Sequence, residues 1–108
     1  WIQRHVFPGS LLPSFGRILS ALRRTGDLGL HHFEEMGMHY AETLDRWNRN
    51  LLEKRSQAHA LGYDDREIRR WNYYFNYCKA AFSMQNITVA QMVFSRPNNE
   101  TLRRMVHA

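Results

Sequence analysis

The chain has 108 residues, of which 44% are hydrophobic and 13% aromatic, and its formal net charge is +5. This length allows at most one small domain, and the apolar content excludes an intrinsically disordered chain. The sequence has no apolar run near 18 residues and no basic-then-apolar leader, so we expect neither a membrane-spanning helix nor a signal peptide.

The N-terminal part predicts a short apolar start, a turn and one amphipathic helix. The chain opens at Trp1 without an initiator methionine, so we expect a fragment whose upstream part is missing. Residues 8–10, Pro-Gly-Ser, should end the first helical turn because proline and glycine interrupt regular structure. Ser14 is suited to cap the next helix, whose apolar residues share one face, and Gly26 is suited to end it.

Two long helices joined by a turn are predicted for the middle of the chain, over residues 39–61 and 65–82. Gly62 should end the first, and Asp64 followed by Glu67 resembles a capping box for the second. Apolar residues recur at spacings of three and four, which places them on one face of each helix, so the helices can pack as an antiparallel pair. The stripes are Tyr40, Leu44, Trp47 and Leu51, then Ile68, Trp71, Phe75, Cys78 and Phe82. We expect both striped tryptophans to be buried.

Strands are predicted on either side of this helical pair, over residues 28–35 and 87–94. The second is apolar on both faces, which is typical of a strand buried on both sides. Two strands cannot supply such surroundings alone, so we expect the rest of a larger sheet upstream. Residues 98–108 should form a loosely ordered tail.

Few side chains carry an obvious chemistry. Tyr40 opens its stripe, so its hydroxyl can reach a polar cavity, although an ordinary packed tyrosine is the alternative that the pattern alone favours. His39 can orient Tyr40 or simply sit in the first helical turn. His31 and His32 should point to opposite faces of a strand, which does not suit two ligands of one metal. Cys78 lies in an apolar stripe and predicts a packed thiol, not a nucleophile.

Four short motifs stand out along the chain: Phe7-Pro8-Gly9 with Leu12-Pro13-Ser14, the run from His39 to Leu44 with Trp47, Gly62-Tyr63-Asp64, and Tyr77-Cys78 with Phe82. Together they resemble the cyclopropane-fatty-acyl-phospholipid synthases and the related mycolic acid methyltransferases. They occur in the order and at about the spacings of that family, and the resemblance covers residues 1–97.

The resemblance implies an α/β fold, with the chain as the C-terminal part of a class I S-adenosylmethionine-dependent methyltransferase (Rossmann-like) fold. Three main helices and two strands of that domain would lie within residues 1–97. The cofactor loop would lie in the missing N-terminal part, because no Gly-x-Gly-x-x-Gly loop occurs here. The fragment alone should therefore bind no S-adenosylmethionine and should not catalyse.

The chemistry that the resemblance implies is methylene or methyl transfer to the cis double bond of an unsaturated phospholipid acyl chain. S-adenosylmethionine would be the donor and a bound bicarbonate the base. Tyr40 matches the family's bicarbonate-binding tyrosine. The expected location is cytoplasmic, with peripheral membrane contact, and a single cysteine fits a reducing compartment.

The chain departs from the family pattern at several positions. Lys79 occupies a place that is usually acidic and Ala81 one that is commonly glycine, which puts the substrate in doubt more than the fold. Cyclopropanation, methyl branching and amine methylation are not separated by the residues present. The rival interpretation is a basic helical module that binds nucleic acid or membrane through its arginine clusters. The apolar stripes argue against it, so no nucleic-acid partner is expected.

Overall fold

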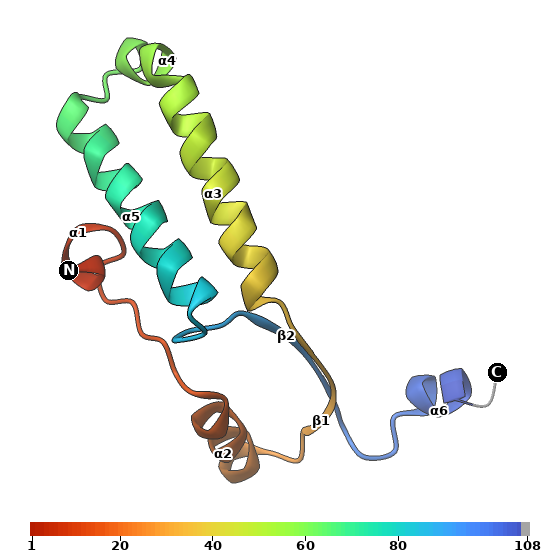
Figure 1. Ribbon diagram of the computed structural model, residues 1–108. Coiled ribbons are helices and arrows are strands. Elements are labelled where there is room, and N and C mark those ends of the chain that lie inside the picture. Colours follow the sequence, from red (N-terminus) through yellow and green to blue (C-terminus); the bar gives the residue numbers. More distant parts are fainter. Residues whose placement is uncertain (107–108) are drawn as a thin grey trace.

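The computed structural model describes residues 1–106, in which six helices and two strands form an α/β arrangement. A helical hairpin extends from one end of a two-stranded sheet, and the described chain measures 55 × 32 × 28 Å (Figure 1). The elements are α1 (Ile2–His5), α2 (Phe15–Thr25), β1 (Gly29–Glu35), α3 (Gly37–Glu53), α4 (Arg55–Ala60), α5 (Asp65–Ser83), β2 (Ala90–Ser95) and α6 (Glu100–Val106). The prediction of helices combined with two strands is confirmed.

Helix boundaries follow the predicted capping residues. The Ser14 hydroxyl accepts a hydrogen bond from the backbone N–H of Arg17 at 3.3 Å, and α2 ends at Gly26. Asp64 and Glu67 form the complete capping box of α5, each side chain accepting from the other residue's backbone N–H. Such caps satisfy amide groups that a helix leaves without partners, so they fix where each helix begins.

The two long helices, α3 and α5, run antiparallel and pack along their lengths, as predicted (Figure 1). The prediction of a single helix over residues 39–61 is wrong in one respect. The chain leaves α3 at Lys54 and continues as the separate helix α4. Lys54 has φ −97° and ψ 22°, which departs from helical geometry. The turn is completed at Gly62, whose φ of +95° is a conformation that suits glycine.

The core lies where α3 and α5 approach the sheet. Its buried members are Ala41, Leu44, Cys78 and Phe82, and Leu44 is fully inaccessible to solvent. One polar residue, Asn48, is also buried, and its side-chain oxygen accepts a hydrogen bond from Asn72 of α5 at 2.9 Å. The two helices are thus joined by apolar packing and by one hydrogen bond that specifies their alignment.

The sheet consists of β1 and β2 in antiparallel register, from Gly29 opposite Ser95 to Glu35 opposite Ala90, with an irregularity between Leu30 and His32. The described residues do not bury the second strand on both faces, and its burial by further strands upstream stays a prediction. All residues of β1 are exposed, and those of β2 are at most half-buried. Only sparse contacts from α2 reach the sheet, such as the edge-to-face contact of Phe15 with Phe33 at 5.0 Å, so most of both faces stays open.

The C-terminal segment contains α6, which falls in the part where we expected a loosely ordered tail. Residues 107–108 of that tail lie outside the described residues. Within residues 1–106, no helix has both the length and the apolar character needed to cross a membrane.

Candidate functional site

The first turns of α3 meet the last turns of α5, and this brings together two segments that are far apart in the sequence. Tyr40 lies half-buried against the core, with its ring centroid 4.9 Å from that of Phe82 in an edge-to-face arrangement. Trp47 contacts the Tyr40 ring from two turns further along α3, with the ring centroids 6.0 Å apart. Tyr40 is therefore held by aromatic contacts on two sides, a geometry that fixes where its hydroxyl lies.

A hydrogen-bond network at the end of β1 holds the start of α3. One carboxylate oxygen of Glu35 accepts the backbone N–H of Gly37 at 2.7 Å and also accepts the Thr88 hydroxyl. The backbone N–H of Met36 donates to the carbonyl of Val89 at 2.8 Å, which ties the same turn to the segment before β2. A carboxylate at a helix N-terminus is also favoured by the helix dipole. The network fixes the position from which Tyr40 projects.

Sequence reasoning missed Glu35 and Thr88 as members of this network. The signal present was an acidic residue just before a helix start, which is a common way to satisfy the first amide groups. Thr88 carried no such signal, because its pairing with Glu35 joins residues 53 positions apart.

Tyr74 and Cys78 of α5 place neutral polar groups in the same apolar wall. Burial, followed by the neighbouring Cys78 thiol, raises the pKa of Tyr74 to about 12, and the nearby Tyr40 adds to this shift. Burial also raises the pKa of Cys78, opposed in part by a hydrogen bond with Tyr74. Both groups therefore stay protonated at neutral pH, and the prediction of a packed thiol at position 78 is confirmed.

Lys79 forms an interhelical ion pair at the position where the family resemblance leads one to expect an acidic residue. Its ammonium group lies 2.5 Å from a carboxylate oxygen of Asp45 on α3, and Arg49 contacts the other oxygen at 2.8 Å. The hydrogen bond from Lys79 is the main cause that lowers the pKa of Asp45. Lys79 thus acts within this chain as a bridge between α3 and α5.

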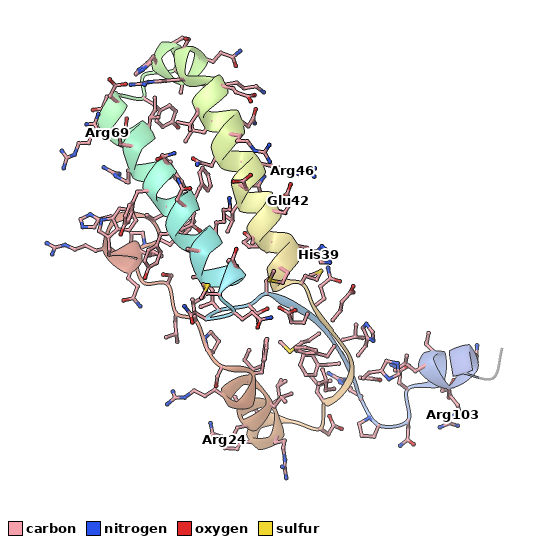
Figure 2. All side chains as sticks on the ribbon, viewed as in Figure 1. Arg24, His39, Glu42, Arg46, Arg69 and Arg103 are labelled. Carbon is pink, nitrogen blue, oxygen red and sulfur yellow. The ribbon has the colours of Figure 1, made fainter. Side chains whose placement is uncertain are left out.

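The other polar candidates lie on the surface. His39 is exposed in the first turn of α3, the simpler of the two alternatives (Figure 2). Figure 2 also shows Glu42 and Arg46 on the side of α3 away from α5, where they form an ion pair at 2.8 Å. His31 and His32 are exposed on β1. None of these residues joins Tyr40 in a common site.

An open groove of about 530 Å³ lies between α3 and α5 at the end remote from the sheet. Trp47 is 48% exposed there and Trp71 is half-buried, so the prediction that both are buried is wrong. The stripes are present, but the two helices leave an apolar groove at this end in place of a closed core. The main apolar residues of the groove are Trp47, Leu51, Leu61, Ile68, Trp71 and Phe75. Truncating Trp47 should consequently cost less than the roughly 3 to 5 kcal/mol of a buried tryptophan.

The residues present do not fit a cradle for S-adenosylmethionine. Such cradles require a strand followed by a glycine-rich loop that allows close approach of the backbone. Within residues 1–106, β1 is followed after one residue by α3, and β2 is followed by Arg96-Pro97-Asn98. No step of cofactor binding is therefore assigned to this chain.

Three relatives illustrate what the chain is similar to. The chain is 33% identical over 96 residues to a tuberculostearic acid methyltransferase of Mycobacterium tuberculosis, covering 89% of the chain and 22% of that protein. It is 32% identical over 103 residues to the cyclopropane-fatty-acyl-phospholipid synthase of Escherichia coli, covering 95% of the chain and 26% of that protein. A sphingolipid C9-methyltransferase of Gibberella zeae is 28% identical over 104 residues, covering 95% of the chain and 20% of the relative.

The chain thus spans about a quarter of the length of these relatives or less. Residues 1–92, which include every segment that forms the wall around Tyr40, match the family model described as mycolic acid cyclopropane synthetase. The segments that the resemblance singled out in α3 and α5 are the ones that meet in space, and the chain belongs to the mycolic acid cyclopropane synthetase family.

Proposed function

We propose that this chain is the C-terminal part of an S-adenosylmethionine-dependent methyltransferase that modifies the cis double bond of unsaturated phospholipid acyl chains. The observation that carries the proposal is the meeting of the His39–Leu44 segment with Cys78 and Phe82 in one cluster. The printed names of the relatives, which include fatty-acyl-phospholipid and fatty acid enzymes, support a lipid acceptor. The activity would belong to the complete protein, acting at the cytoplasmic surface of a membrane.

The proposed architecture is the last two strands of a Rossmann-like sheet with the helical hairpin inserted between them. In this arrangement, further strands would continue the two-stranded sheet of β1 and β2. The antiparallel pairing of these two strands and the open faces of their sheet are compatible with that arrangement. A covered sheet would bury the apolar side chains of β2, such as Met92 and Phe94, that are half-buried here.

Tyr40 is proposed as a donor to a small anion beside the reacting lipid. Transfer of a methyl group to an alkene leaves a positive charge on carbon, and loss of a proton from the new methyl group then closes the ring. Bicarbonate, when bound, would accept that proton. A phenol held in a fixed place can donate a hydrogen bond to such an anion and orient it. The contacts of Tyr40 with Phe82 and Trp47 supply that fixed placement.

The test is methyl transfer by the complete protein from labelled S-adenosylmethionine to vesicles of unsaturated phospholipid. Gas chromatography of the released acyl chains separates a cyclopropane from a methyl branch, and a sphingolipid acceptor serves as a parallel arm. Label on phospholipid acyl chains supports the proposal. Label only on an amine, or on no lipid at all, overturns it.

Tyr40→Phe should lower turnover by roughly tenfold to a hundredfold, because a hydrogen bond of about 1 to 3 kcal/mol to the bound base is lost. Added bicarbonate should restore part of the rate, and the melting temperature should stay nearly unchanged. Tyr73→Phe is a matched control, because Tyr73 is an exposed tyrosine of the same hairpin. Full turnover with a lower melting temperature would mean that Tyr40 serves packing alone.

A further inference from the structure

The helix that carries Tyr40 starts without a capping side chain of its own. Ser14 caps α2 and Asp64 caps α5, each by accepting a hydrogen bond from an amide three residues further on. The corresponding residue of α3 is Met36, whose side chain makes no such bond. The first amides of a helix need partners from outside the helix. The start of α3 therefore depends on groups that its own first turn does not supply.

One of these partners comes from the segment before β2. The backbone N–H of Met36 donates to the Val89 carbonyl at 2.8 Å, and the Met36 carbonyl accepts the N–H of Tyr40 at 2.9 Å. A single residue thus connects the backbone of Tyr40 with a segment that follows α5 in the sequence.

Thr88 secures the same junction through its side chain. Its hydroxyl donates to a carboxylate oxygen of Glu35, and that oxygen also accepts the backbone N–H of Gly37 at 2.7 Å. Both chain neighbours of Thr88 pack against the same buried cluster as Tyr40. This short segment therefore contacts both the core and the carboxylate at the start of α3.

The junction has little room to adjust. Gly37 is buried, and a Cβ atom at that position would lie 2.5 Å from the Thr88 hydroxyl oxygen and 2.6 Å from a Glu35 carboxylate oxygen. In packing as close as this, a displaced group moves its neighbours. A change in the hydrogen bond between Thr88 and Glu35 should therefore reach the backbone of the first turn of α3, which contains Tyr40.

We propose that Glu35 and Thr88 are positioning residues for the Tyr40 hydroxyl, which they hold in place through the Gly37 amide at the start of α3. The inference rests on the proposed function, in which that hydroxyl donates to a bound anion. Misplacing such a group by about 1 Å can cost about a hundredfold in rate. The contacts with Phe82 and Trp47 hold the Tyr40 ring, whereas this network holds the helix start.

The test measures turnover of the complete protein on vesicles of unsaturated phospholipid, well below the unfolding temperature of each variant. Thr88→Val replaces the hydroxyl with a methyl group and should lower kcat by about tenfold, with the KM for lipid changed less than about twofold. Thr88 is exposed, so the substitution leaves no cavity in the core. Thr88→Ser keeps the hydroxyl and should keep most of the rate.

A second variant and a control complete the set. Glu35→Gln should lower kcat in the same way, because an uncharged amide oxygen is a weaker acceptor than a carboxylate. It carries the test alone if Thr88→Val does not fold. Thr25→Val is the matched control on α2, where the hydroxyl donates to the Ala21 carbonyl at 2.9 Å, and it should leave kcat unchanged.

The decisive measurement repeats Thr88→Val in the Tyr40→Phe background. If the network acts through the Tyr40 hydroxyl, nothing is left to position, and the second change should lower kcat by less than about twofold. An equal loss of rate in both backgrounds would overturn the inference, because the network would then act on another group or on the fold as a whole.

A further readout does not need the reaction. Fluorotyrosine at position 40 reports the surroundings of that ring by fluorine NMR of the complete protein. Thr88→Val and Glu35→Gln should shift its resonance, whereas Thr88→Ser and Thr25→Val should not. An unmoved resonance in the first two variants would overturn the positioning role. Shifted resonances in a protein that methylates no lipid would support the network and remove only the proposed function.

Discussion

Gly37 is the position where the smallest change should have the largest local effect. A Cβ atom added there would lie 2.5 Å from the Thr88 hydroxyl oxygen, 2.6 Å from a Glu35 carboxylate oxygen and 3.3 Å from the Thr88 Cβ. The first two distances are shorter than real contacts of a Cβ atom, so Gly37→Ala must displace at least one of these side chains. Both belong to the network that begins α3.

The expected cost follows from three contributions. Overpacking of a tight site costs typically about 1 to 3 kcal/mol, and the Thr88 side chain is too short to move aside freely. Displacing Glu35 weakens the cap on the Gly37 amide, which is worth about 1 kcal/mol. Alanine in a helix gains up to about 1 kcal/mol over glycine. The net loss should be about 1 to 3 kcal/mol in the free energy of unfolding.

The assay is urea-induced unfolding of the complete protein, followed by far-ultraviolet circular dichroism. Thr88→Ala in the Gly37→Ala background should restore part of the loss, because it removes the atom at 2.5 Å. Gly16→Ala in α2 is the control: its nearest neighbour would be 4.0 Å away, so this variant should be as stable as the original or more so. If Gly37→Ala were stabilising to the same extent as Gly16→Ala, the close approach of Thr88 to α3 would be refuted.

Three further predictions concern the ion pair, the buried amide and the cofactor. Asp45→Asn should lower stability near neutral pH, because the lowered pKa of Asp45 means that its carboxylate stabilises the folded state at every pH above its unfolded pKa. The difference should persist down to about pH 4, the ordinary pKa of an aspartate, and decline below it as the pH falls through the lower folded pKa, which urea midpoints across that range will show. Asn48→Ala should cost about 1 to 3 kcal/mol by leaving Asn72 without its partner, and a double-mutant cycle with Asn72→Ala measures the coupling. Isothermal calorimetry should detect no S-adenosylmethionine binding by the 108-residue chain, and micromolar affinity would contradict this.

Much of the local structure could be predicted because its causes are local. The cap at Ser14, the capping box at Asp64 and the stop near Gly62 each depend on residues within four positions of one another. The pairing of α3 with α5 followed from stripes that repeat within each helix. The break at Lys54 could not be predicted, because neither glycine nor proline marks it.

The candidate site was predictable only in part, for the same physical reason. Tyr40 stood out by its place at the start of a stripe and by the family resemblance. Glu35 and Thr88 did not, because strand pairing brings them together across 53 positions. Lys79 was recognised as a departure from the family pattern, but its partner Asp45 became evident only when the two helices were aligned.

The exposed position of Trp47 shows why a stripe alone does not decide burial. Periodicity places a residue on the inner face of a helix, but burial also requires side chains that fill the space opposite. Near the sheet, Phe82 and Cys78 fill that space against Leu44. At the end of the hairpin remote from the sheet, Trp47 and Trp71 line a groove that their neighbours leave open, although Ile68 of the second stripe is buried there. Position in a stripe therefore predicts the inner face of a helix, and the neighbouring side chains decide whether that face is closed.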